Sequence, residues 1–503
     1  MSRVRTNVLA NVGGKAYVAV VNLVALPIIA RLLGYEAYGL VGLYASFQAM
    51  MMLLDVGLTA TLGRSVAAIS AAETPESASE LGDVVRTFLV VFVGTGLFGS
   101  MILGAASSVI VHHWLKLGSL NPATAQHCIV LMAWMLGAQW PTGILLGVLV
   151  ALERQVMANA LMAAVATLRS FGGVLVLRIG LPTPERFLWW QLSATVAYTI
   201  VCWYVVRRAL PEAPRRARFD LNVVKSRRHF VGGTALISVL SVAMVQADRI
   251  VLSKLLPLDA YGQYVLAATA ASSLALVVAP VTQALYPGLV RLVERRNLDE
   301  LRKHFHLMAQ LVSLALLPVA AAITLSPIRA LTAWTGDSVL ARHVAWPFVL
   351  LVVANVANGI MNGPYYLQLA WNSTRITVIL NTIAVLVLVP ALVVSAHAAR
   401  GLGAAAATAL VSLTYLAGGG VLIIRQFLNG QYFAYAIHDV AWPGVAAVAG
   451  ATVARFVPCP DSRVAAAVSV AGGACAAFAA AFASLGMTRR WFVATLRALR
   501  ASR

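Results

Sequence analysis

Residues 25–58 read ALPIIARLLGYEAYGLVGLYASFQAMMMLLDVGL. Two apolar runs flank the short stretch RLLGYEAYG at 31–39, which holds a basic residue, Arg31, and an acidic residue, Glu36. A helix needs about 20 mostly apolar residues to cross the hydrocarbon core of a bilayer. The stretch therefore predicts the end of one membrane-spanning helix, a tight connection and the start of the next.

The same pattern returns at residues 254–262, which read KLLPLDAYG. Each copy has a basic residue, two leucines, an acidic residue and then Ala-Tyr-Gly, and each lies between two apolar runs. An even number of predicted spans separates the copies, so both halves of the chain have the same orientation. A parallel repeat is a standard construction of alternating-access transporters. A duplication that only enlarged a helix bundle is the other interpretation.

The composition of the whole chain supports a membrane location. The chain has 503 residues, of which 60% are hydrophobic and only 11% are charged, yet its formal net charge is +20. An ordinary soluble domain has about 25% charged residues, and disordered chains are poor in apolar ones. A soluble nucleic-acid binder would need a polar surface that this chain hardly has, so we expect no nucleic-acid partner. The four cysteines are widely spaced and are interpreted as small apolar residues.

The apolar runs predict an all-α polytopic membrane protein with about 14 transmembrane helices. Two parallel six-helix repeats, an N-lobe and a C-lobe, are expected around a central cavity, with two extra helices at the C-terminus. The predicted spans are 8–30, 38–63, 87–111, 126–151, 156–177, 187–206, 231–253, 261–286, 306–326, 344–369, 375–396, 401–424, 435–457 and 464–486.

The distribution of Lys and Arg predicts the orientation. About two thirds of the 38 basic residues fall in connections that lie on the same side as both termini, and cytoplasmic loops carry such an excess. We therefore expect both termini in the cytoplasm. The predicted parts are 1–206 (N-lobe), 207–230 (a basic cytoplasmic linker), 231–424 (C-lobe), 425–486 (spans 13 and 14) and 487–503 (a basic cytoplasmic tail).

Polar residues inside or directly beside the predicted spans are the candidate site residues, because such groups are costly in hydrocarbon and are commonly functional. Helical spacing places Tyr44, Gln48 and Asp55 on one stripe of the second span, and Asn11, Lys15 and Asn22 on one stripe of the first. The candidates for substrate binding are Lys15, Arg31, Arg169, Arg249, Asn11, Asn22, Tyr44, Gln48, Asn355, Asn358 and Asn362. The candidates for ion coupling are Asp55 and Asp248. In the seventh span, Thr234, Ser238 and Ser241 extend the stripe of Asp248.

Structural roles compete with these assignments. Asp248 and Arg249 are alternatively an ion pair, or partners of Asp55 and Lys254, and Lys15 alternatively extends to the cytoplasmic surface. Arg169 is either a cavity cation or a partner of Asp55. The asparagines alternatively join helices by hydrogen bonds without binding substrate.

The motifs of several enzyme classes are not found in the sequence. The string nearest to a phosphate-binding loop, at 13–16, lacks the required spacing and hydroxyl, and no HExxH or similar metal-ligand spacing occurs. We expect a protein that is not an enzyme and has no cofactor, with possible coupling to H⁺ or Na⁺.

Residues 25–58 together with two later segments resemble the oligosaccharide or polysaccharide flippase family, the Wzx type of the MATE-like (MOP) exporter superfamily. The later segments are SVLSVAMVQADRIVLSKLLPLDAYGQYVLA at 238–267 and APVTQALYPGLVRL at 279–292. The resemblance implies a bacterial inner-membrane protein. Such a protein moves an undecaprenyl-pyrophosphate-linked oligosaccharide, the repeat unit of an O-antigen, capsule or exopolysaccharide, from the cytoplasmic to the periplasmic leaflet.

Under this resemblance the candidate cations would neutralise the pyrophosphate, and the Asn, Gln, Ser and Tyr side chains would bind the sugar. Asp55 or Asp248 would take up H⁺ or Na⁺ in the transport cycle. The expected partners are the lipid-linked sugar, membrane lipids, and a polysaccharide polymerase and glycosyltransferases of the same pathway. A cation-coupled MATE-type exporter of small molecules is the second hypothesis, and a membrane scaffold without transport is the third.

Overall fold

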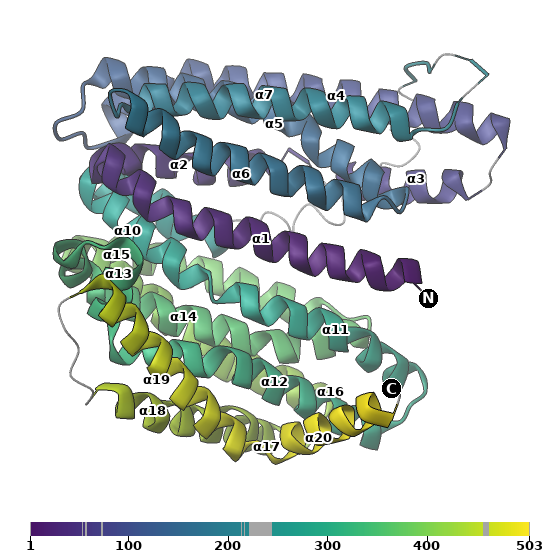
Figure 1. Ribbon diagram of the computed structural model, residues 1–503, viewed down its shortest axis with the longest axis vertical. Helices are drawn as coiled ribbons and strands as arrows, with labels where there is room; N and C mark the ends of the chain where they lie inside the picture. The colour runs from purple at the N-terminus through teal and green to yellow at the C-terminus, as the bar shows by residue number, and fades with distance from the viewer. Residues whose placement is uncertain are drawn as a thin grey trace. The chain divides into compact units, whose positions relative to one another are not determined.

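The computed structural model describes residues 2–52, 54–55, 58–71, 74–212, 214–215, 217–220, 244–455 and 462–501. Half of the predicted linker and the first half of the predicted seventh span, with Thr234, Ser238 and Ser241, lie outside these ranges. The chain divides into two compact units, Met1–Gly262 and Gln263–Arg503, shown in Figure 1.

The first unit consists of helices. They are α1 (Ser2–Leu33), α2 (Tyr35–Met52), α3 (Leu58–Ser70), α4 (Pro75–Val109), the π-helix η1 (Ile110–Trp114), α5 (Pro122–Ala151), α6 (Gln155–Ile179), α7 (Pro184–Ala209) and a helix over 244–255.

Local signals explain where several of these helices begin. Thr74 and Ser77 form a capping box in which each side chain accepts a hydrogen bond from the other residue's backbone N–H, and Pro75 follows as the first residue of α4. Asn121 caps α5 by accepting from the backbone N–H of Ala123, and Thr183 caps α7 by accepting from that of Arg186; each is followed by proline. The helix starts are therefore encoded by the residues at the starts themselves.

The packing in the first unit pairs both neighbouring helices and helices that are distant in sequence. Contacts link α4 with the next α-helix, α5, and also link α1 with α6 and α5 with α7 (Figure 1). Side chains of α3, α4, α5 and α7 form a core that includes Leu62, Phe88, Ile144 and Cys202, all at most 1% exposed. In a water-soluble protein, burial of each such side chain would stabilise the fold by about 2–3 kcal/mol through the hydrophobic effect. In a bilayer, van der Waals packing between helices takes the place of the hydrophobic effect.

The second unit is also helical and begins within α10. Its elements are α10 (Leu258–Ser272), α11 (Ala275–Glu294), α12 (Leu298–Leu325), α13 (Pro327–Thr335), α14 (Ser338–Ala370), α15 (Arg375–Thr414), η2 (Tyr415–Gly419), α16 (Gly420–Phe427), α17 (Tyr432–Ala434), η3 (Tyr435–Ala441), α18 (Trp442–Arg455), α19 (Arg463–Ser484) and α20 (Gly486–Ala501).

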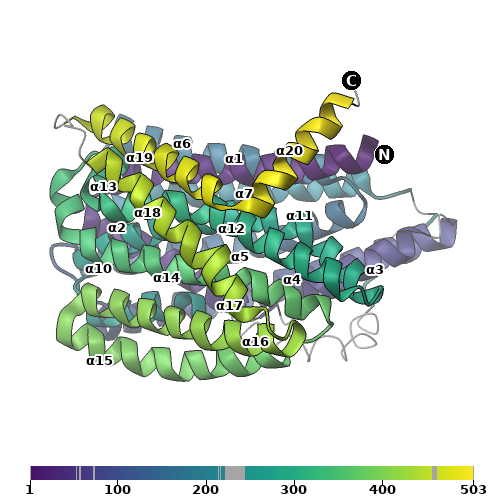
Figure 2. The same ribbon diagram turned by 90° about the horizontal axis from the view of Figure 1, so that it is seen from below.

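The small residues at the C-terminal end of the chain let its helices approach closely. Figure 2 shows α18 and α19 side by side, and Ala447, Ala451, Ala477 and Ala481 pack between them at no more than 4% exposure. Alanine and glycine at such a contact let two backbones approach each other within a membrane. The alanine-rich composition of the last two predicted spans is thus a packing feature.

The prediction of an all-α polytopic membrane fold is confirmed. In the described part of the chain, nine helical segments are long and apolar enough to cross a membrane. The 53-residue segment Arg375–Phe427 contains two predicted spans, and non-helical backbone at Ala399 and Arg400 marks the boundary between them.

The prediction of one continuous span over 38–63 was wrong. α2 ends at Met52 and α3 begins at Leu58. Asp55 lies between them, and its Oδ1 accepts hydrogen bonds from the backbone N–H and the hydroxyl of Thr59, both at 2.9 Å. Aspartate is more favourable at the start of a helix, where its carboxylate accepts from backbone N–H groups, than in the interior of a helix. The helix is therefore interrupted at Asp55.

Candidate functional site

A cluster of polar side chains forms at the middle of the first unit, and we call it the Arg169 cluster. It contains Tyr44 of α2, Gln139 of α5, Arg169 of α6 and Gln191 of α7. Arg169 Nε donates to Gln191 Oε1 at 2.7 Å, and Gln191 Nε2 donates to the carbonyl oxygen of Arg169 at 2.9 Å. The guanidinium carbon lies 6.0 Å from the centre of the Tyr44 ring, and the Tyr44 hydroxyl donates to Gln139 Oε1 at 2.7 Å.

The partners of Arg169 in this cluster are neutral. The ion pairs among the described residues join Arg215 to Asp83, Arg302 to Asp299, Lys303 to Glu300 and His306 to Asp439. Arg169 is therefore not the partner of Asp55, whose carboxylate caps α3. A partly buried guanidinium held by amides and an aromatic ring keeps its positive charge available to an anion in surroundings of low dielectric.

The break after α2 also changes the predicted stripe of the second span. Tyr44 and Gln48 lie one turn apart on α2, and both are partly buried. Asp55 follows the end of that helix, so it does not share their helical face. The expectation that Tyr44, Gln48 and Asp55 form one stripe was wrong for Asp55, because the stripe assumed an unbroken helix.

The polar stripe of the first span faces a neighbouring helix. Asn11 Nδ2 donates to Gln155 Oε1 at 2.6 Å, and Asn159 Nδ2 donates to Asn11 Oδ1 at 2.6 Å. Further along, Ser170 donates to Asn22 Oδ1 at 3.0 Å. These bonds join α1 to α6, as polar side chains commonly do between membrane helices. Asn11 and Asn22 thus have the helix-joining contacts that were the alternative to substrate binding.

The remaining candidates of the first unit lie apart from this seam. Lys15 and Arg31 are exposed at different turns of α1. Asp248 and Arg249 are partly buried in the helix over 244–255, where Asp248 Oδ1 accepts from the backbone N–H of Arg249 at 2.8 Å.

The candidates of the second unit lie on α14. Asn355 Nδ2 donates to the Leu351 carbonyl at 2.8 Å, and Asn362 Nδ2 donates to the Asn358 carbonyl at 2.9 Å. Asn358 is exposed and reaches Ser412 on α15 at 3.4 Å. Asn362 Nδ2 also lies 3.3 Å from the Gly359 carbonyl. All of these bonds within α14 are made by amide N–H groups, so the carboxamide oxygens of Asn355 and Asn362 can accept hydrogen bonds from a ligand.

Aromatic side chains continue this polar face of α14. The rings of Tyr286 and Tyr366 lie 5.2 Å apart, and those of Tyr365 and Tyr366 lie 5.6 Å apart. Gln368 is 1% exposed, and its Oε1 accepts from Thr377 at 2.6 Å. Tyrosine and amide side chains offer both a flat apolar face and hydrogen-bonding groups, which is the chemistry that a sugar surface requires.

Sequence reasoning missed Gln139 and Gln191, the two amides that complete the Arg169 cluster. Both interrupt apolar runs of predicted spans, so the signal for them was the same as for the residues that were chosen. It also missed Gln155 and Asn159, which bind Asn11. Gln155 and Asn159 lie one turn apart on α6, but nothing in the sequence shows that this face of α6 meets Asn11 of α1.

Comparisons with known proteins place this arrangement in a wider context. No curated protein sequence matches the chain. A lipid II flippase, MurJ, in an inward closed conformation has a similar fold with a TM-score of 0.67. The two chains are 11% identical, and the match covers 93% of this chain and 97% of that one.

Two MATE transporters, of which one is described as a multidrug resistance transporter, also share the fold. A MATE-family transporter of the MOP superfamily, in an inward-facing conformation, has a TM-score of 0.61 at 14% identity, with 80% of this chain and 94% of that chain covered. A MATE transporter of Vibrio cholerae has a TM-score of 0.57 at 16% identity, with 86% and 98% covered. At these identities, the similarities show the fold that this chain shares with the three proteins and nothing of what it binds.

The family is shown by sequence. The model of a family described as polysaccharide biosynthesis protein matches residues 4–293, which are more than half of the chain and include both copies of the Ala-Tyr-Gly motif and the whole Arg169 cluster. This chain is therefore a multi-pass membrane protein of the polysaccharide biosynthesis family, with the fold of the MOP-superfamily flippases and transporters.

Proposed function

We propose that this protein is a flippase that moves an undecaprenyl-pyrophosphate-linked oligosaccharide from the cytoplasmic to the periplasmic leaflet by alternating access. Family membership supports a role in polysaccharide biosynthesis, and the fold supports a lipid flippase or a related transporter. The proposed location is the bacterial inner membrane, with both termini in the cytoplasm.

The Arg169 cluster carries the proposal. Arg169 lies 14 residues after Gln155, the first residue of α6. Side chains from four helices meet there, and among the described residues the partners of the guanidinium are neutral. A pyrophosphate has negative charge that a guanidinium binds through charge-assisted hydrogen bonds. The amide and phenol groups beside it, Gln139 and Tyr44, would bind sugar hydroxyls, as would the α14 asparagines.

Reconstituted vesicles that carry a fluorescent lipid-linked oligosaccharide test this proposal. The transfer of the label between leaflets is measured for the native protein, for Arg169→Gln and for Arg178→Gln. Arg178 is a matched control because it lies on the same helix α6 but is exposed in its last turn. We expect Arg169→Gln to lower the transfer rate at least about tenfold, the loss of one charged contact, and Arg178→Gln to retain the native rate. Equal rates for the two variants would contradict the role of Arg169.

The fold of the MATE transporters makes a small-molecule exporter the second candidate. Such a protein would transport a cationic dye, and Asp248, partly buried in its helix, would be needed for coupling to H⁺ or Na⁺. The same vesicles loaded with a dye separate the two functions. Dye transport that is abolished by Asp248→Asn, without transfer of the lipid-linked sugar, would overturn the flippase proposal.

The pathway partners follow from the proposed substrate. Glycosyltransferases must build the lipid-linked oligosaccharide before it is moved, and a polysaccharide polymerase would consume it on the other side. Membrane lipids surround the helices throughout. Co-purification of such enzymes with the tagged protein from the native membrane measures whether they associate.

A further inference from the structure

A cleft opens at one end of the first unit between α4, α7 and the chain that follows α7. Its volume is about 1050 Å³, and its lining includes Gly82, Arg86 and Val90 of α4 and Trp203 and Arg207 of α7. The third wall is residues 214–220, of which Pro214, Arg215 and Ala217 line the cleft. We call the described part of 214–220 the strap.

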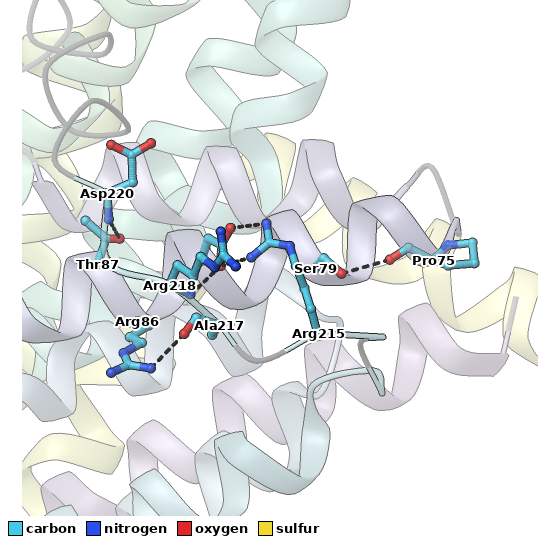
Figure 3. A network of polar contacts seen from close by, with 9 residues as sticks. Pro75, Ser79, Arg86, Thr87, Arg215, Ala217, Arg218 and Asp220 are labelled. Carbon is cyan, nitrogen blue, oxygen red and sulfur yellow. Dashed lines mark hydrogen bonds and ion pairs between the residues drawn. The ribbon is translucent and has the colours of Figure 1, made fainter.

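The strap is fixed to α4 by several hydrogen bonds, shown in Figure 3. Arg215 donates to both oxygens of Asp83, at 3.1 Å and 2.5 Å, and the backbone N–H of Arg218 donates to Oδ1 of the same carboxylate at 2.5 Å. The Arg86 guanidinium donates to the carbonyl of Ala217 at 2.6 Å. A bidentate Arg–carboxylate pair gives a defined geometry as well as energy, so the third wall has a specific position.

A further bond and a close packing contact extend this attachment. The backbone N–H of Asp220 donates to the Thr87 hydroxyl at 3.0 Å (Figure 3), and Thr87 is fully buried. A Cβ atom on Gly82 would lie 3.3 Å from the Cβ of Ala217. The strap therefore lies directly against α4.

The cleft has an excess of positive charge. Arg86, Arg207 and Arg215 face one acidic lining residue, Glu212. Arg215 forms an ion pair with Asp83, which balances its charge. The remaining charged lining residues are two cations, Arg86 and Arg207, and one anion, Glu212. Arg207 stacks on the Trp203 ring at 5.5 Å, an arrangement that orients the guanidinium and leaves its N–H groups at its edge.

The cleft lies beside the end of α7, at a position that corresponds to the level of the lipid headgroups. Arg207 lies in the last turn of the 26-residue helix α7, and Arg86 lies in the first third of the 35-residue helix α4. Val90, 48% exposed, and Trp203, 43% exposed, extend from the cleft along the spanning parts of the same two helices. Tryptophan is enriched at the level of the headgroups, and basic pockets between membrane helices bind anionic lipid headgroups.

We propose that the α4–α7 cleft binds an anionic phospholipid. Arg86 and Arg207 contact the phosphodiester, the strap closes one side of the headgroup, and the acyl chains lie along Val90 and Trp203. This site is separate from the Arg169 cluster and does not depend on the proposed transport function.

Quenching of Trp203 fluorescence by lipids tests the proposal. The full-length protein is placed in phosphatidylcholine vesicles that contain increasing fractions of phosphatidylglycerol with brominated acyl chains. Bromine quenches tryptophan only at short range, and the difference between the native protein and Trp203→Phe isolates the signal of Trp203. We expect this signal to saturate at a low fraction of brominated phosphatidylglycerol, and to fall only in proportion to composition with brominated phosphatidylcholine.

Two variants and one control locate the site. The double variant Arg86→Gln/Arg207→Gln should need about 25-fold more phosphatidylglycerol for half-maximal quenching, because each of the two basic residues near the membrane surface contributes about a fivefold affinity. Asp83→Asn, which releases the strap while keeping both cleft cations, should show a smaller loss. Arg208→Gln is the control, since Arg208 stacks on Tyr204 at 4.6 Å and does not line the cleft.

The outcomes separate the possible ligands. Saturable quenching that 10 mM inorganic phosphate leaves unchanged supports a lipid site, whereas competition by phosphate at that level would indicate a site for free phosphate and overturn the proposal. Equal loss in Arg208→Gln and in the double variant would also overturn it, because a general surface attraction would then explain the binding. Circular dichroism checks that each variant is folded.

Discussion

Arg169 and Gln191 bind each other in both directions: the Arg169 guanidinium donates to the Gln191 side chain at 2.7 Å, and the Gln191 side chain donates to the Arg169 backbone at 2.9 Å. Gln191 is 6% exposed. The amide therefore fixes the orientation of the one charged side chain in the Arg169 cluster and joins α6 to α7 at the same point.

Gln191→Leu should lower both stability and transport. The substitution leaves a partly buried guanidinium and a backbone carbonyl without their partner, which costs about 1–3 kcal/mol. Thermal unfolding in detergent measures the first effect, and the leaflet-transfer assay measures the second. Ser193→Ala, on the exposed side of the same helix, is the control. A native melting temperature for Gln191→Leu would show that this pair does not position Arg169.

Gly39→Ala should destabilise the first unit. Gly39 and Gly262 end the two copies of the repeated motif, and a Cβ atom on Gly39 would lie 2.3 Å from the carbonyl oxygen of Leu258 and 3.0 Å from the backbone nitrogen of Gly262. Both neighbours are backbone atoms, so they cannot rotate away, and overpacking of this kind costs at least about 1–3 kcal/mol.

Thermal unfolding measures the effect at Gly39 against Gly63→Ala in α3, where an added Cβ would meet nothing within 4 Å. The control should unfold at the native temperature or slightly above it, since alanine favours helices. Equal stability of the two variants would show that the repeat glycines are not in close contact.

Glu36→Gln should lower the stability of the protein near neutral pH, because Glu36 binds the residues between η1 and α5. Partial burial by itself raises the pKa of Glu36, but hydrogen bonds from the Ser119 hydroxyl and from the backbone N–H groups of Gly118, Ser119 and Leu120 outweigh it and leave the pKa lowered. A carboxyl with a lowered folded-state pKa contributes stability above its unfolded pKa, and that contribution is lost as the pH falls through the folded value.

The difference in stability between the native protein and Glu36→Gln should therefore be largest near neutral pH and should vanish once Glu36 is protonated in both states. Thermal unfolding at a series of pH values from 7 down to 3 gives the profile. A difference that stays constant over this range would exclude the carboxylate as the cause.

His306→Ala should destabilise the second unit strongly. His306 Nδ1 contacts Asp439, which is 1% exposed and also accepts from Gln310 Nε2 at 2.9 Å, while His306 Nε2 faces Gln431 Oε1 at 3.0 Å. Both ring nitrogens face acceptors, as in an imidazolium ion. Removal of one partner of a buried ion pair costs about 3–5 kcal/mol, because the other charge is left uncompensated.

The matched control is Lys303→Ala, one turn earlier on α12, which removes an exposed i,i+3 pair with Glu300 and should cost less than about 1 kcal/mol. Asp439→Asn, which keeps the shape and removes the charge, should be milder than His306→Ala. Similar melting temperatures for His306→Ala and Lys303→Ala would contradict a buried pair. Thermal unfolding of these variants reports on α12, η3 and α20 together. Gln310 of α12 donates to Asp439 of η3, and its Oε1 accepts from Thr488 of α20 at 3.1 Å.

The local sequence determined the class of the protein and many helix boundaries. Hydropathy along 25–58 and the repeat at 254–262 were enough to predict a helical membrane protein of two related halves, because the cost of exposing backbone and charge to hydrocarbon acts on each segment separately. The flippase family could be identified for the same reason: its motifs are short and lie within single segments. The predicted division between the spans 375–396 and 401–424 coincides with the non-helical Ala399 and Arg400.

The tertiary structure decided which polar residues meet. Arg169 and Asn11 are both polar groups in apolar surroundings, and nothing in their local sequence assigns one to a neutral cluster and the other to a seam between helices. Their partners are 22 residues away for Gln191 and 144 for Gln155. The cap at Asp55 differs, because its partner Thr59 is only four residues away. Hydropathy is a property of one segment, whereas a hydrogen bond between helices depends on how both helices are rotated and spaced, and only packing fixes that.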